Sequence, residues 1–114
     1  MGFWRKELID FALDHETSRH IREQREWIAR EPANALPHKN LAQLYRIQGR
    51  REEALGLLLE AVRLDNGFAE AHVELSEIYT VIGDFRTAWR HARLALSNGN
   101  SSAVELLERH GVSE

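Results

Sequence analysis

The chain has 114 residues, a formal net charge of −3 and no cysteine. This near balance of charge argues against a dedicated binder of nucleic acid or anionic membranes, which needs a concentrated basic surface. Without cysteine the sequence cannot supply a disulfide, a thiolate metal site or a cysteine nucleophile. Its hydrophobic and charged contents are ordinary for a globular protein, and its N-terminus has no signal-peptide hydrophobic region. We therefore expect one cytoplasmic domain with no membrane segment.

The first expected element is residues 1–34, where two groups of apolar side chains need a partner surface. The first group is Phe3, Trp4, Leu8 and Phe11, and the second is Trp27 and Ile28. One arrangement is two helices with a break near residues 14–18, and the alternative is one long helix from Phe3 to Arg30. The demand of both groups for a partner favours the two helices.

The next two elements are copies of one unit, because sliding the chain by 34 residues aligns residues 35–68 with residues 69–102. Eight of these 34 positions are identical. The identical pairs are Ala35/Ala69, His38/His72, Leu41/Leu75, Tyr45/Tyr79, Gly49/Gly83, Ala54/Ala88, Ala61/Ala95 and Asn66/Asn100.

The repeated positions match the needs of helix packing. Leu41, Leu44 and Tyr45 lie on one helical stripe, at i, i+3 and i+4 spacing. A glycine such as Gly49 just beyond that stripe ends a helix at low cost in the left-handed conformation. Alanines seven residues apart then allow a second helix to approach its neighbours closely. Each unit is therefore predicted to be a helix, a tight turn and a second helix.

These positions resemble the tetratricopeptide repeat pattern W-x2-L-G-x2-Y…A-x3-F…P. Both units have His where the pattern has Trp, and Asn66 or Asn100 where it has the terminal Pro. The resemblance implies an all-α fold, a right-handed superhelical solenoid of antiparallel helix pairs with about three repeats. The single domain 1–114 would then comprise a divergent first repeat (1–34), two repeats (35–68 and 69–102) and a capping helix (103–111).

The last expected element is the capping helix, because repeats of this kind bury their apolar faces only against neighbours. Ser101 or Ser102 is predicted to cap a helix over residues 103–110, which Gly111 closes. The side chains expected to cover the open end of the second repeat are Val104, Leu106 and Leu107.

No residue pattern indicates catalysis. His15 and His20 are five residues apart, so their rings diverge on a helix and cannot form a zinc-protease site. His38 and His72 occupy the same packing position of the repeat, and His91 and His110 have no partner at ligand spacing. The three arginines between Arg46 and Arg51 fit a solvated turn better than a phosphate or RNA site. We expect no enzyme activity, no metal ion and no cofactor.

The resemblance implies that the first helix of each unit lines a concave groove that binds a ligand. The groove positions are Arg5, Ile9, Ala12 and Leu13 in the divergent unit, Leu36, Lys39, Gln43, Arg46 and Ile47 in the next, and Glu70, Val73, Glu74, Glu77, Thr80 and Val81 in the last. Basic residues lie toward the N-terminal half of this groove and acidic residues toward the other half. We therefore expect a bound peptide to direct its acidic portion toward Lys39 and Arg46.

The best-known ligand of the family, the C-terminal carboxylate of heat-shock chaperones, does not fit these residues. Lys39 matches one position of that carboxylate clamp, but Gln43 and Glu74 stand where asparagines are needed. A glutamate facing a carboxylate repels it.

These residues predict a protein–protein interaction module, an adaptor, scaffold or assembly factor that binds a peptide or protein segment. The alternative is a structural protein that self-associates through Phe3, Trp4 and Trp27, so a homo-oligomer is possible. Neither function involves nucleic acid or a membrane.

Overall fold

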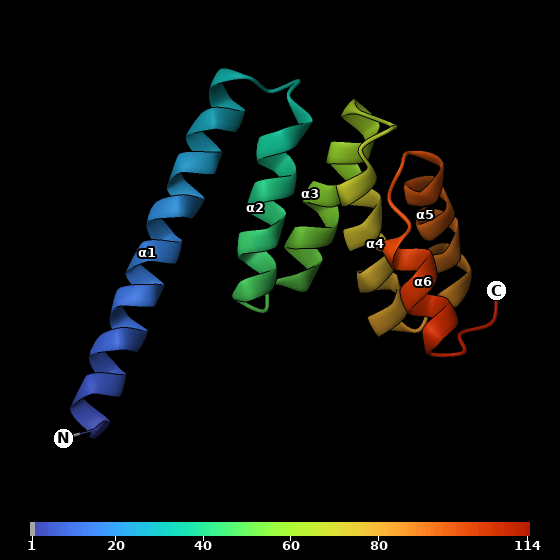
Figure 1. Cartoon of the computed structure of the whole chain (residues 1–114). Coiled ribbons are helices and arrows are strands. Elements are labelled where there is room, and N and C mark those ends of the chain that lie inside the picture. The colour runs from blue at the N-terminus through green and yellow to red at the C-terminus, as the bar shows by residue number, and fades with distance from the viewer. Residues whose placement is uncertain (1) are drawn as a thin grey trace.

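The computed structural model in Figure 1 describes the backbone of residues 2–114 and the side chains of residues 6–114. Over this part the chain forms six α-helices: α1 (Gly2–Arg30), α2 (Ala35–Ile47), α3 (Arg51–Leu64), α4 (Ala69–Ile82), α5 (Phe85–Ser97) and α6 (Ser102–Arg109). The predicted all-α fold is confirmed. None of the described helices is long and apolar enough to cross a bilayer.

The two copies of the repeat are two antiparallel helix pairs that stand side by side (Figure 1). Helices α2 and α3 form the first pair, and α4 and α5, which begin 34 residues later in each case, form the second. Ala54, Ala61, Ala88 and Ala95 are completely buried, as the repeat predicts. Their methyl groups allow the close approach of neighbouring helix backbones, where a larger side chain would overpack the contact.

Tight turns within each pair depend on glycine. Gly49 and Gly83 have φ angles of 77° and 93°, in the left-handed region that other residues avoid. The N–H of Gly83 donates to the carbonyl of Tyr79 at 3.0 Å, which closes the end of α4. The predicted helix ends at these two glycines are confirmed.

One continuous core joins the two pairs. Leu41 and Tyr45 from α2, Leu58 from α3, and Leu75 and Ile78 from α4 belong to a single buried cluster. The main apolar term in the stability of the fold is therefore the burial of these side chains between adjacent helices.

Helix α1 contradicts the favoured prediction of two helices in residues 1–34, because it runs without a break from Gly2 to Arg30. The segment near residues 14–18 contains no glycine or proline to end a helix. Ion pairs of Glu16 with Arg19 and His20, one turn away, also support helix across it.

Only the C-terminal half of α1 packs on the repeats. Ile21 and Ile28 reach the main core, and Gln24 accepts a hydrogen bond from Asn40 of α2 at 3.2 Å. This half ends at Arg30, 34 residues before the end of α3 at Leu64, so it has the register of a second helix of a repeat. The first helix of that repeat is missing, because the N-terminal half of α1 continues straight past the end of α2 (Figure 1).

Helix α6 lies where the capping helix was expected. Ala103 and Leu107 form a second buried cluster with Trp89 and Ala92 of α5, and Val104 packs against it. Leu106, which was expected to cover the same end, is exposed. Ser101 is the N-cap residue, as predicted, but its hydroxyl makes no capping hydrogen bond.

The side chain of Asn100 takes over that role. Its Oδ1 accepts from the N–H of Ser102 at 3.0 Å and from the Ser102 hydroxyl at 2.7 Å. The carboxamide therefore satisfies a donor at the start of α6 that has no partner within the helix.

Two buried histidines meet in the second pair, although sequence spacing gave His91 no partner. The Nδ1 atoms of His72 and His91 are 3.0 Å apart, and Nε2 of His72 lies 2.9 Å from the carbonyl oxygen of Asn66. A carbonyl only accepts, so His72 donates through Nε2 and accepts from His91 through Nδ1. His91 Nε2 is then a buried acceptor without a partner, and its ring stacks on Tyr79.

The histidine pair makes the stability of the fold depend on pH. Burial, together with the adjacent ring of His72 and the positive charge of Arg90, lowers the pKa of His91 to about 4. The unfolded chain, with a histidine pKa of about 6.5, takes up a proton that the folded chain refuses. We expect His91 to cost about 3 kcal/mol of stability as pH falls from about 6.5 to 4.

Urea unfolding of the wild type and His91→Gln at several pH values checks this expectation. Glutamine can still donate to His72 but does not titrate. The wild type should lose stability faster than the variant as pH falls, and parallel curves would contradict the role of His91.

A second prediction compares two glycines of opposite conformation. Gly56 lies inside α3, and a methyl group added there meets no atom within 4 Å, so Gly56→Ala should stabilise the chain by about 1 kcal/mol. Gly83 has a φ of 93°, so Gly83→Ala should destabilise it by about 1–2 kcal/mol. Thermal unfolding measures both, and a Gly83→Ala variant as stable as the wild type would show that the turn does not require glycine.

Candidate functional site

The predicted groove residues of the two repeats come from α2 and α4, the first helices of the two pairs. The structure brings five of them into one polar cluster between these helices: Lys39, Gln43, Arg46, Glu74 and Glu77. We call the cluster and the apolar side chains beside it, Leu36, Ile47 and Val81, the α2–α4 surface.

Arg46 joins the two helices electrostatically. Its Nη1 lies 3.5 Å from Oε1 of Glu74, and its Nη2 lies 3.3 Å from Oε2 of Glu77. The basic and acidic halves that the sequence suggested therefore meet at this point. Arg46 is not an isolated cation available to an acidic ligand, because two carboxylates already share its charge.

Glu74 is the unusual member of the cluster, since a carboxylate is buried there on the surface of a repeat. Only 8% of the residue is exposed, and its Oε2 has no hydrogen-bond partner among the described residues. Burial raises the pKa of Glu74, opposed by a hydrogen bond from Gln43 and by the charges of Arg46 and Lys39. A buried acceptor without a donor is energetically costly, and a ligand that supplies an N–H removes this cost.

Lys39 lies at the other end of the cluster. Its Nζ is 6.0 Å from the centre of the Phe68 ring, at the outer limit of a cation–π contact. Phe68 was not among the predicted groove residues, because it is the last residue of its 34-residue unit and immediately precedes α4. No sequence signal distinguishes it from an ordinary core aromatic.

Apolar side chains flank the polar cluster. Ile47 and Val81, equivalent positions in the two repeats, are 73% and 70% exposed, and Leu36 is exposed as well. Glu70 is exposed at the start of α4. Exposed apolar side chains of this kind lower the free energy when another apolar surface covers them.

The other predicted groove residues do not join this cluster. Val73 packs toward α6, and the hydroxyl of Thr80 donates to the carbonyl of Ser76 within its own helix. Ile9, Ala12 and Leu13 are exposed on the part of α1 beyond α2. The side chain of Arg5 lies outside the described residues.

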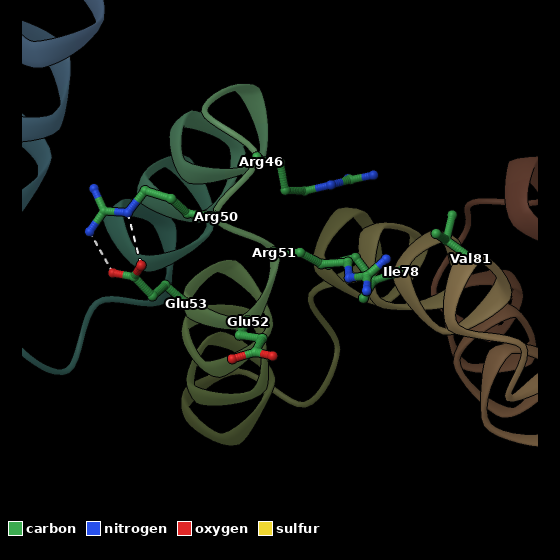
Figure 2. A pocket seen from close by; sticks show the side chains of 8 residues that line it. Arg46, Arg50, Arg51, Glu52, Glu53, Ile78 and Val81 are labelled. Carbon is green, nitrogen blue, oxygen red and sulfur yellow. Dashed lines mark hydrogen bonds and ion pairs between the residues drawn. The ribbon is translucent and has the colours of Figure 1, made fainter.

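A cleft of about 560 Å³ opens beside the turn between α2 and α3, next to the polar cluster. Its lining includes Arg46, Arg51, Glu52, Ile78 and Val81. Figure 2 shows that Arg46 extends toward the α4 side of the cleft, whereas Arg50 points the opposite way.

Arg50 interacts with side chains next to it. Its Nε donates to Glu53 at 2.9 Å, and its guanidinium lies 4.0 Å from the centre of the Tyr45 ring. The turn therefore carries both signs of charge and does not offer a concentrated basic site for phosphate.

No group of three potential metal ligands gathers among the described residues. The close histidine pair, His72 and His91, is buried in the core, where each ring packs or hydrogen-bonds within the protein. The α2–α4 surface is therefore suited to recognition through hydrogen bonds and apolar contact.

Comparison with known proteins gives two findings. Residues 14–99 match the sequence model of a family described as Tetratricopeptide repeat. Over 86 residues, 73% of the chain, it is 39% identical to the TPR repeat-containing thioredoxin TTL4 of Arabidopsis thaliana. The chain spans 13% of the length of that protein.

The burial of Glu74 leads to a prediction for the α2–α4 surface. Because its pKa is raised in the folded state, the folded chain holds the Glu74 proton more tightly than the unfolded chain. Ionisation of Glu74 as pH rises above about 4.5 therefore lowers stability, and Glu74→Gln removes this loss. The difference in unfolding free energy, variant minus wild type, should increase between pH 4 and 7.

Glu77→Gln is the matched control, because Glu77 accepts from the same Arg46 but its side chain is 39% exposed. The stability of this control variant shows the effect of losing an Arg46 contact alone. A difference for Glu74→Gln that stays constant with pH would mean that this carboxylate is as well solvated in the folded chain as in the unfolded one.

Proposed function

The chain belongs to the tetratricopeptide repeat family, and on that premise we propose that its α2–α4 surface binds a peptide or protein segment. Repeats of this family generally mediate protein–protein interaction and do not catalyse reactions. The proposal places this function on particular residues of the chain.

The observation that carries the proposal is the unpaired Oε2 of the buried Glu74. The Glu74 side chain must turn outward for this oxygen to accept a backbone or side-chain N–H from an extended segment laid between α2 and α4. Its apolar side chains can at the same time cover Ile47 and Val81, which stand exposed on the same two helices. Hydrogen bonds would orient the segment, and apolar burial would supply most of the affinity.

The charges of the surface support one orientation of the segment. Lys39 and Arg46 are outnumbered by Glu70, Glu74 and Glu77, and Arg46 is already paired with two of these carboxylates. We therefore propose that the acidic portion of the segment lies near Lys39 only. A cationic or N–H-rich portion would lie near Glu74 and Glu77.

The chain would serve as an adaptor, scaffold or assembly factor in the cytoplasm, alone or as part of a larger protein. Its matched relative is named a thioredoxin, but the chain covers only a small part of that relative's length. These 114 residues contain no cysteine, so they cannot carry a dithiol reaction themselves.

Selection of peptides from a random phage-displayed library against the immobilised chain tests the proposal. Synthetic copies of the enriched peptides are then titrated against the wild type and an Ile47→Asp, Val81→Asp double variant. Both positions are exposed, so the variant should fold normally. We expect binding to weaken at least about tenfold, since a charge replaces each apolar contact.

Leu59→Asp, Leu96→Asp is the matched control, because it places two charges at exposed leucines on α3 and α5, the second helices of the pairs. It should bind the same peptides as the wild type does. Equal weakening by the two double variants, or weakening by the control alone, would move the binding surface away from α2 and α4.

A further inference from the structure

The N-terminal half of α1 extends beyond the repeats and contacts none of the other described helices (Figure 1). This half is nevertheless apolar in part: Leu8 is 64% exposed and Phe11 is 71% exposed. An isolated helix end of this kind is marginally stable in water unless another surface covers it.

One face of α1 is free of α2 along its entire described length. At about 100° per residue, Phe11 and Asp14 fall on the same side of the helix as Ser18, Arg22 and Arg25. All five residues are exposed. We call this side, together with Glu7, Asp10 and the half-buried Ile21 along its edges, the open face of α1.

The open face has opposite charges at its two ends. Glu7, Asp10 and Asp14 lie in the N-terminal half, whereas Arg22 and Arg25 lie in the C-terminal half. None of these five residues makes an ion pair with a described side chain.

One group of charges on α1 is paired within the helix itself. Glu16 and Glu23 both pair with Arg19 and His20 on another side of the helix. The open face therefore carries acidic residues at one end and basic residues at the other, none of them in an ion pair within the described part of the chain.

The same face contains a shallow hollow of about 440 Å³ near its basic end, lined by Ser18, Ile21, Arg22, Arg25, Glu26 and Ala29. Phe11 cannot fill the hollow of its own helix, since Phe11 and Ile21 are separated by about 15 Å along the axis. Phe11 of another chain can reach it.

We propose that two copies of this chain dimerise through the open faces of their α1 helices, packed antiparallel. A two-fold axis beside residue 16 would place Phe11 of each copy on the hollow at Ile21 of the other. The same register sets Glu7 opposite Arg25 and Asp10 opposite Arg22, so both ends of the interface gain opposite charges. A two-fold interface must be self-complementary, and the charge pattern of α1 is complementary to its own reverse.

The dimer covers Phe11 of each copy, whereas Ile9 and Leu13 lie on the opposite side of α1. The interface uses no residue of the α2–α4 surface. It is therefore independent of the peptide-binding proposal. Either one can fail without the other.

A charge-swap experiment on the full chain tests the dimer. In one variant the acidic end is reversed (Glu7→Lys, Asp10→Lys), and in the other the basic end is reversed (Arg22→Glu, Arg25→Glu). Each variant alone brings like charges together at both ends of the interface, whereas a mixture of the two restores opposite charges. Sedimentation velocity and native mass spectrometry measure the species present.

We expect a wild-type dimer that weakens as salt is raised, at least about tenfold weaker self-association of each variant, and a heterodimer in the equimolar mixture. Restored assembly in the mixture also shows that both variants are folded. Glu52→Lys, Glu108→Lys, a double reversal at exposed positions on α3 and α6, should dimerise like the wild type.

Three outcomes would overturn the proposal. The first is a wild type that remains monomeric at all concentrations, which would leave the open face to a different protein or to solvent. The second is undiminished dimerisation of both variants, which would place the interface elsewhere. The third is a mixture that forms no heterodimer.

Discussion

Over residues 2–114 each helix can bury its apolar face only against the helices next to it, because no sheet or second layer covers the described stack. The close spacing this requires depends on small side chains: Ala54, Ala61, Ala88 and Ala95 are completely buried where helix backbones meet. Leu58 and Leu75, also without exposed surface, fill the space that these alanines leave. Stability is thus carried by contacts between neighbours, and each end of the stack must be closed by something else.

The two ends are closed differently. At the C-terminal end, α6 covers Trp89 with Ala103 and Leu107, and the indole Nε1–H of Trp89 donates to the carbonyl of Val112 at 3.0 Å. At the N-terminal end, only half of α1 serves as a neighbour for α2, and the other half leaves the stack. The exposed Phe11 and the unpaired charges of α1 follow from this difference, and they are the basis for expecting a second copy at that end.

The binding proposal places the segment on the first helices of the two pairs. Helices α2 and α4 pack on either side of their shared neighbour α3, and side chains join the surface that they present. Arg46 connects that surface through Glu74 and Glu77, and Glu74 is buried with one oxygen unpaired. A buried carboxylate with an unused acceptor is a poor stabiliser of the fold alone, which is why we propose that Glu74 accepts from a bound segment.

Much of this fold could be predicted from the sequence, because the repeated positions act locally. Gly49 and Gly83 end helices by their own backbone preference, and the alanines seven residues apart mark the close contacts. The path of residues 1–34 could not be predicted in the same way, since a helix can continue or break near Asp14 at little difference in local energy. The pairs His72–His91 and Arg46–Glu74 were also missed, because they join different helices and depend on the rotation of one helix against another. The groove residues were assigned by resemblance, and only the structure shows which of them meet.

The central claim is that a protein segment binds between α2 and α4, and amide chemical shifts of the ¹⁵N-labelled chain test it most directly. Titration with a selected peptide should shift the resonances of Lys39, Gln43, Arg46, Glu74 and Glu77 most strongly, together with those of Ile47 and Val81. Resonances of α5 should change little. Shifts concentrated on α5 or α6, with the α2–α4 residues unmoved, would contradict this account of the binding surface.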